Sequence, residues 1–135
     1  MKYHFMLHIP SLYIMESEGR GRGVFTSEEV EVDCVIELCP LIIIPKKEVT
    51  LIHKTVLHDY YYVIPNDSGD VCFPLGYGLI YNHSPNPNAE IFINLETNYF
   101  EVHCIRKIEI GEEIFVNYQD TDSENKKPRL WFEVK

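Results

Sequence analysis

Short apolar segments separated by polar or glycine-containing turns run along most of the chain and predict β-strands. In the first third, apolar residues alternate or run together over residues 12–15, 24–26 and 30–38, as they do in strands. Residues 41–44 form an aliphatic, largely β-branched run that ends at Pro45, so we expect a buried strand there. The first third therefore predicts several short strands.

The middle of the chain interrupts this pattern once and then returns to it. Apolar residues at positions 49, 52 and 56 have helical spacing, which predicts one short helix within residues 46–57. Residues 60–64 (YYYVI) predict a strand with aromatic side chains on both faces, and residues 66–70 (NDSGD) predict a hairpin turn.

The second half continues in the same way. Strands are expected at residues 91–93 and 99–102 on either side of a turn at residues 96–98, and a last strand at residues 114–118. The fold class is therefore mostly β with little helix.

Residues 75–88 (LGYGLIYNHSPNPN) form a stretch that is dense in conformationally special residues. Gly76 and Gly78 admit backbone conformations or close approaches that a side chain forbids. Pro85 and Pro87 fix the exit from the stretch and restrict the residues before them. Asparagine, serine, proline and glycine are also ordinary turn formers, so a purely structural loop has the same composition. Alone, this stretch does not decide between a structural and a functional role.

Length and charge narrow the class of protein. We expect residues 1–135 to form a single domain, large enough for its own core, with a C-terminal tail at residues 119–135 that is polar as far as residue 128. The formal net charge of −9 argues against direct binding of nucleic acid and suits a cationic partner such as a basic peptide. No apolar run is long enough to span a membrane and the N-terminus lacks the pattern of a signal peptide, so we expect an intracellular protein.

The cysteines and histidines do not have the spacing of a metal site. The four cysteines include no C-x-x-C pair, and three of them have β-branched or aromatic neighbours, as buried free thiols do. A metal-bound β-domain that uses these cysteines with His53, His58 and His83 is the weakest alternative, because their spacing fits no common site. We therefore expect no bound metal.

Three motifs in a fixed order resemble those of one protein family. The first is residues 21–25 (GRGVF), the second is residues 81–84 (YNHS) followed by Pro87 and Asn88, and the third is residues 111–118 (GEEIFVNY). In this order they resemble the SET domain, and the likeness runs from about residue 12 to residue 118. The chain is most similar to the minimal SET-only proteins of large viruses and bacteria, which lack flanking zinc modules.

The resemblance implies a fold, a reaction and a cofactor. The fold would consist of several small β-sheets with a knot-like crossing near the C-terminus. The reaction would be methyl transfer from S-adenosylmethionine, which leaves S-adenosylhomocysteine, to the side-chain amine of a lysine in a basic protein such as a histone. The alternative is an inactive SET-like module that binds a peptide or the cofactor. A homodimer, and a nuclear or bacterial cytoplasmic location, are compatible with either.

The resemblance also implies roles for individual residues near the cofactor. Asn82 would hold the methionine end of the cofactor through its amide, and His83 would pair with the adenine edge mainly through its backbone. Glycine at position 23 would let the main chain approach the ligand. The implied cofactor-binding residues are Arg22, Gly23, Val24, Tyr81, Asn82, His83 and Tyr118.

Catalysis and the lysine channel would depend on aromatic residues. The resemblance points the hydroxyl of Tyr118 at the place of methyl transfer, and Tyr60 matches a second tyrosine that lines the channel, with Tyr62 beside it. A dry aromatic channel lowers the pKa of a lysine amine from its ordinary value of about 10.4, which favours the neutral nucleophile. Trp131 and Phe132 would close this channel in place of a zinc-bound segment; simple docking of a terminal strand is the alternative.

Overall fold

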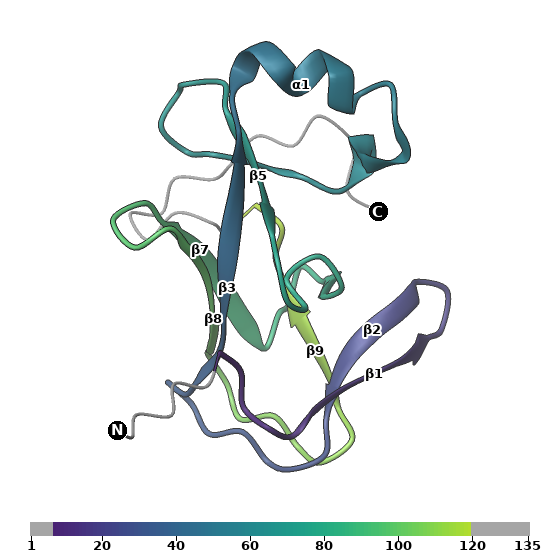
Figure 1. Ribbon diagram of the computed structural model, residues 1–135. Coiled ribbons are helices and arrows are strands. Elements are labelled where there is room, and N and C mark those ends of the chain that lie inside the picture. The colour runs from purple at the N-terminus through teal and green to yellow at the C-terminus, as the bar shows by residue number, and fades with distance from the viewer. Residues whose placement is uncertain (1–6, 120–135) are drawn as a thin grey trace, which may run out of the picture.

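One long strand, β3 (Val35–Ile44), runs through most of the molecule and organises the larger of two sheets (Figure 1). The computed structural model describes residues 7–119. The larger sheet has the order β4-β5-β3-β8-β7, and every neighbouring pair in it is antiparallel. Its other strands are β4 (Tyr62–Val63), β5 (Val71–Pro74), β7 (Ala89–Asn94) and β8 (Tyr99–Cys104).

The second sheet brings together three distant parts of the chain. Its order is β1-β2-β9-β6, with β1 (Leu12–Ser17), β2 (Gly21–Thr26), β9 (Glu113–Val116) and β6 (Asn82–His83). The last strand, β9, lies between β2, with which it is antiparallel, and β6, with which it is parallel. This insertion of the last strand beside the 75–88 stretch agrees with the crossing that the resemblance implied.

The helical content is small but differs from the expected single helix. Residues 7–119 contain two helical elements, α1 (Lys46–Ile52) and the 3₁₀ helix η1 (Val56–Asp59). They separate because the hydroxyl of Thr55 accepts a hydrogen bond from the N–H of Leu57 and so caps a new helix start. Val56, which extends the helical spacing in the sequence, is 74% exposed. None of the helices within residues 7–119 has the length and apolar character of a membrane span.

The expected buried strand at residues 41–44 is wrong in its burial. These residues continue β3, but Ile42 and Ile43 are 46% and 40% exposed. The reason is that β8 pairs with β3 only as far as Pro40, after which β3 has β5 as its strand neighbour. The β-branched run therefore predicted the strand correctly but not its burial.

Two other segments also differ from expectation. Within residues 60–64 the strand is limited to β4, because Tyr60 caps η1 through its backbone N–H, which bonds to the carbonyl of Leu57. In the segment from residue 30 to 38 the strand begins at Val35, and Val30 makes an isolated bridge to Ile108. The turns at residues 66–70 and 96–98 join strands as predicted.

A single large cluster of buried side chains lies where the two sheets meet. It is built from alternate residues of the strands, and it includes Tyr62, Tyr81, Phe100 and Ile114, with Tyr118 packed against it. All four cysteines are free; Cys34 is half-buried and the other three are buried. The second and third motifs both contribute side chains to this cluster, and they thereby fix the second sheet to the core.

Candidate active site

The first motif places glycine where two polar side chains reach the backbone of β2. Gly23 lies opposite Met15 in the β1–β2 hairpin. A Cβ atom at Gly23 would collide with the carboxylate of Glu113 and would lie 2.9 Å from Nδ2 of Asn82. Glycine is therefore required here for close approach, because any side chain would displace both groups.

The side-chain amide of Asn82 has a fixed orientation. Its nitrogen donates to the carbonyl oxygen of Arg22 at 3.1 Å and to Oε2 of Glu113 at 2.7 Å. Both amide hydrogens are thereby used, which leaves Oδ1 as an acceptor for a donor from outside. The structure thus brings together the motif residues at positions 22, 23 and 82.

Glu113 is a site residue that the sequence analysis did not assign. Besides the Asn82 amide, it accepts a hydrogen bond of 2.6 Å from the hydroxyl of Ser17, which is buried at the end of β1. The signal was present in the sequence, because an acid stands directly before the apolar run of the last strand within the third motif. A partly buried carboxylate at this point holds the Asn82 amide through its nitrogen.

Asn88 belongs to the second motif and had no predicted role. In the structure its side chain joins the second motif to the third. Its side chain is 2% exposed. Nδ2 donates to the carbonyl of Glu113 at 2.9 Å, and Oδ1 accepts from the N–H of Phe115 at 2.8 Å. An asparagine side chain thus pairs with β9 as a neighbouring strand would, after β6 has ended.

Tyr118 follows β9 and is fixed at both its backbone and its hydroxyl. Its hydroxyl donates to the carbonyl oxygen of Tyr81 at 2.9 Å, and its backbone N–H donates to Nδ1 of His83 at 3.2 Å. Burial, and secondarily the charge of Glu113, raise the pKa of Tyr118 to about 12. The phenol therefore stays protonated at neutral pH and acts as a hydrogen-bond donor.

His83 is an acceptor in this arrangement. Because Nδ1 accepts the N–H of Tyr118, the neutral ring carries its proton on Nε2. Burial lowers the pKa of His83, which favours this neutral form. The ring also lies against Tyr118, with 5.2 Å between the ring centroids. These contacts keep His83 as a neutral hydrogen-bond acceptor.

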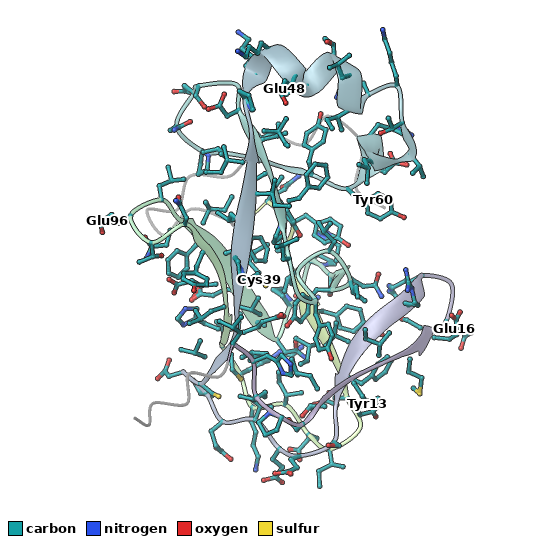
Figure 2. The ribbon with its side chains drawn as sticks, in the orientation of Figure 1. Tyr13, Glu16, Cys39, Glu48, Tyr60 and Glu96 are labelled. Atoms are coloured by element: carbon teal, nitrogen blue, oxygen red, sulfur yellow. The ribbon has the colours of Figure 1, made fainter. Side chains whose placement is uncertain are left out.

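The three tyrosines at residues 60–62 have different surroundings. The ring of Tyr62 is buried and meets the ring of Tyr118 edge-on, with centroids 6.0 Å apart. Tyr61 is also buried but packs with a separate cluster near α1. Tyr60 is 46% exposed at the end of η1, and its side chain points away from β3 (Figure 2). The structure therefore places Tyr62, rather than Tyr60, directly beside Tyr118.

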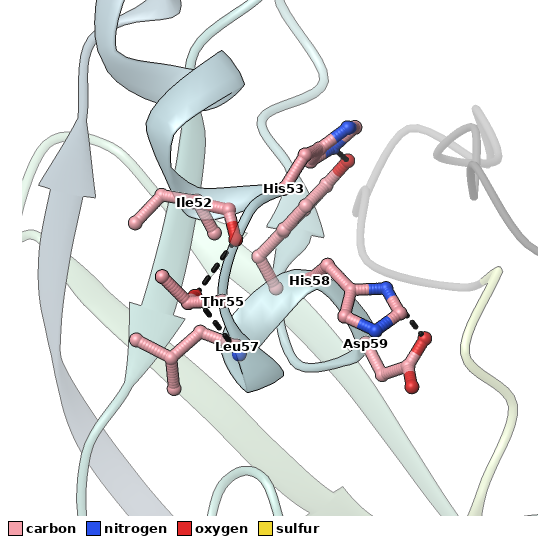
Figure 3. A network of polar contacts seen from close by, with 7 residues as sticks. Ile52, His53, Thr55, Leu57, His58 and Asp59 are labelled. Atoms are coloured by element: carbon pink, nitrogen blue, oxygen red, sulfur yellow. Dashed lines mark hydrogen bonds and ion pairs between the residues drawn. The ribbon is translucent and has the colours of Figure 1, made fainter.

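The segment before Tyr60 is held by a network of polar contacts (Figure 3). The hydroxyl of Thr55 donates to the carbonyl of Ile52 at 2.8 Å and caps η1. His53 and Tyr61 are hydrogen bonded at 2.7 Å with stacked rings. These contacts give η1, and hence Tyr60, a defined position. Trp131 and Phe132 lie outside the described residues.

The chemistry of these groups fits a ligand that carries an ammonium group. The Asn82 amide and the Glu113 carboxylate are hydrogen bonded to each other, and the missing side chain at Gly23 leaves the backbone of β2 open to them. Among residues 7–119, no three His, Cys, Asp or Glu side chains are grouped so that they could hold a metal ion.

Comparisons with known proteins agree with this arrangement. A model of the SET domain family matches residues 21–119. Over 123 residues the chain is 32% identical to a Schizosaccharomyces pombe protein named histone-lysine N-methyltransferase, H3 lysine-37 specific, and the match covers 90% of this chain and 77% of that protein.

Solved structures give the same result. A Plasmodium falciparum protein assigned as a histone methyltransferase superposes with a TM-score of 0.64 at 33% identity, over 80% of this chain and 92% of that chain. A chain of an apo ctPRC2 structure shares the fold, with a TM-score of 0.67 at 20% identity, over 84% of this chain and 15% of its own length. The chain therefore belongs to the SET domain family. Within that family it is a protein-lysine N-methyltransferase, an enzyme class that uses S-adenosylmethionine.

Proposed function

We propose that this enzyme methylates a lysine in a basic, histone-like protein, with β2, β6 and the residues after β9 forming its site. The observation that carries the proposal is the hydrogen bond from the Tyr118 hydroxyl to the carbonyl of Tyr81, directly before Asn82. It joins the implied catalytic phenol and the implied cofactor-binding amide through one peptide unit.

Asn82 and Glu113 are proposed to hold the ammonium end of S-adenosylmethionine. The amide oxygen accepts a hydrogen bond from the ammonium, and the carboxylate beside it favours the positive charge. Backbone groups of Arg22, Gly23 and Val24 would line the remainder of the ligand, as in the family. When bound, the cofactor supplies a methyl group that its sulfonium has already activated.

Tyr118 and Tyr62 are proposed to line the position of the lysine amine. With a pKa of about 12, the Tyr118 phenol is protonated and is not the base that deprotonates the lysine. Its hydroxyl is a polar group in the site, and its hydrogen bond to Tyr81 fixes the position of the ring. A fixed site aligns the reacting atoms. Buried aromatic walls disfavour a charged amine and so favour the neutral nucleophile.

The substrate class is inferred from charge and from the relatives. The chain has a net charge of −9, which favours association with a cationic peptide. The matched Schizosaccharomyces pombe protein is named for a lysine of histone H3. We therefore propose histone tails as the first substrates to test. Residues 119–135, which contain Trp131 and Phe132, are proposed to close the lysine channel.

Transfer of a labelled methyl group tests this proposal. The protein is incubated with labelled S-adenosylmethionine and histone-tail peptides, and each peptide is compared with a version in which arginine replaces every lysine. We expect label in the lysine peptides alone. Asn82→Ala should weaken cofactor binding in calorimetry at least tenfold, because the loss of an interaction with a charged group costs about 1.5–3 kcal/mol.

Asn86→Ala is the matched control, because Asn86 is exposed in the same loop and its hydrogen bonds to Ser84 and Arg106 are made by its backbone. It should bind the cofactor as the parent does. Unlabelled lysine peptides together with an intact cofactor affinity would support an inactive binding module instead. An Asn82→Ala variant with parental affinity would remove Asn82 from the cofactor site.

A further inference from the structure

Glu37 is the one acidic residue that is buried within residues 7–119, and none of the three motifs contains it. It lies on β3 and is 2% exposed. A carboxylate in this position loses its hydration, and burial accordingly raises the pKa of Glu37. An apolar residue of similar size would fill the same volume without this cost. The carboxylate therefore calls for an explanation in terms of its partners.

Two hydrogen-bond donors to the Glu37 carboxylate belong to one short segment, residues 76–81, while Cys39 on the same strand and the charge of His8 also act on it. The hydroxyl of Tyr81 donates to Oε1 at 2.6 Å, and the backbone N–H of Tyr77 donates to Oε2 at 2.9 Å. Gly76 has a φ of 66°, and a Cβ atom there would collide with Oε2. The carboxylate is thus surrounded by the backbone and side chains of the segment that leads into β6.

Tyr81 links this carboxylate to the proposed site. Its side chain is 1% exposed and ends on Glu37, while its backbone carbonyl accepts the hydroxyl of Tyr118 at 2.9 Å. The next residue is Asn82. Any shift of the Tyr81 side chain is therefore passed to the acceptor of the Tyr118 hydroxyl and to the amide of Asn82.

We propose that Glu37 is a positioning residue of the methyltransferase, which holds residues 76–81 so that the Tyr81 carbonyl and the Asn82 amide face the cofactor and Tyr118. The proposal rests on the function proposed above. Glu37 itself contacts neither the proposed cofactor groups nor Tyr118. It acts through Tyr81, and two hydrogen bonds at separate points of the segment fix both its backbone and its side chain.

The variants Glu37→Gln, Tyr81→Phe and their combination test this role. Glutamine keeps the shape of Glu37 but turns one acceptor oxygen into an NH₂ group that cannot accept. Phenylalanine keeps the ring of Tyr81 and removes the hydroxyl. Glu101→Gln is the matched control, because Glu101 also lies in the larger sheet, bonded to Asn94 and His103, but away from residues 76–82.

The first measurement is amide hydrogen exchange in the free protein, which needs no cofactor. In Glu37→Gln we expect exchange at the amides of Tyr77 and Ile80, both hydrogen bonded in the parent, to speed up about tenfold or more, while β7 and β8 keep their protection. Equal loss of protection over β3, β7, β8 and the segment would overturn the proposal, because it would indicate a general core role.

The second measurement is turnover, peptide KM and cofactor affinity, each normalised to the concentration of folded protein. We expect about tenfold lower kcat and weaker cofactor binding in Glu37→Gln, with peptide KM within about threefold, because small misplacements slow transfer steeply. Tyr81→Phe should show the same pattern, and the double variant should be no worse than the worse single one. Additive losses, or parental exchange and cofactor affinity in both single variants, would refute the role.

The design keeps this proposal separate from the proposed function. If Glu37→Gln does not fold, Tyr81→Phe gives both measurements. If the parent transfers no methyl group to any lysine peptide, the proposed function fails. The exchange of Tyr77 and Ile80, together with cofactor affinity, still decides whether Glu37 holds the segment.

Discussion

Tyr118 has two hydrogen bonds with separate consequences, because its N–H fixes the backbone and its hydroxyl reaches the Tyr81 carbonyl. Tyr118→Phe removes the second bond and keeps the ring. We predict about a hundredfold lower turnover, because alignment in the transition state depends on this hydroxyl. The free energy of unfolding should be about 1 kcal/mol lower than in the parent, since one hydrogen bond is lost. Turnover, cofactor affinity and Tm on the same protein check this.

Tyr13→Phe is the control for Tyr118→Phe, since Tyr13 lies at the surface on β1, where a lost hydroxyl should change neither turnover nor Tm. Parental turnover in Tyr118→Phe would contradict the catalytic role. A collapsed Tm would show instead that the hydroxyl serves the core.

His83 predicts a pH dependence of stability. Its folded pKa lies below the ordinary value of 6.5, so the unfolded chain binds the proton first as the pH falls. The stability of the fold is therefore complete above about pH 6.5 and declines below it. In His83→Asn, whose Oδ1 replaces the acceptor Nδ1, we expect a smaller decline of Tm between pH 7.5 and 5.5 than in the parent.

The parent is its own control in this series, because the other histidines are unchanged and only the difference between the two curves is used. Curves that stay parallel over the whole range would contradict a depressed pKa at His83. A raised slope in the variant would reverse the sign of the argument.

At the level of single residues, the sequence indicated the contacts between residues of the recognised motifs. The approach of Gly23 to Asn82, and the link from Tyr118 to the second motif, join groups that motif order already paired. Glu37 and the role of Glu113 could not be found in this way. Glu37 is one acid among many in the sequence; Glu113 stands at a marked position in the third motif, but only the fold shows which polar groups face either of them.

At the level of elements, Asn88 determines how the last strand is held. Asn88→Ala leaves the N–H of Phe115 and the carbonyl of Glu113 without the amide that pairs with them. Because each unsatisfied buried group costs about 1–3 kcal/mol, we predict a loss of about 2–4 kcal/mol in the free energy of unfolding. Urea unfolding measures it.

Asn86→Ala is again the matched control, since the same substitution at an exposed position two residues earlier should leave stability within about 0.5 kcal/mol. Equal stability of the two variants would show that water replaces the Asn88 amide, and that the crossing does not depend on it.

Most strands were predictable because alternation and turn residues mark them locally. The failures have two physical causes. Ile42 and Ile43 are exposed because β8, a partner far away in the chain, ends at Pro40 of β3. Tyr60 leaves the strand for a local reason, because η1 directly precedes it. β6 is two residues long and exists only through β9, so no local pattern could reveal it.

For the whole molecule, the tail is predicted to matter for activity more than for folding. Truncation after Asp120 removes Trp131 and Phe132, which we propose as the cover of the lysine channel. Turnover should fall at least tenfold, because an open channel admits water and favours a charged amine. Tm should stay within a few degrees, since the truncation keeps every strand and both core clusters that the structure describes in residues 7–119.

A milder variant, Trp131→Ala with Phe132→Ala, separates the aromatic side chains from the length of the tail and should reproduce the loss. Normal turnover in the truncated enzyme would assign these aromatics to packing alone. A large drop in Tm would show that the tail belongs to the core.

The position of β9 between β2 and β6 also has a consequence for how the protein is made. The hairpins β1–β2 and β7–β8 close over short turns as soon as both strands have left the ribosome. β2 and β6, which carry the first two motifs, are joined to each other only through β9, so this connection forms only after residues 113–116 have been made. The sheet that carries the motifs is thus completed last. A nascent chain that stalls before Glu113 has no complete active site and leaves unpaired strand edges, to which chaperones bind.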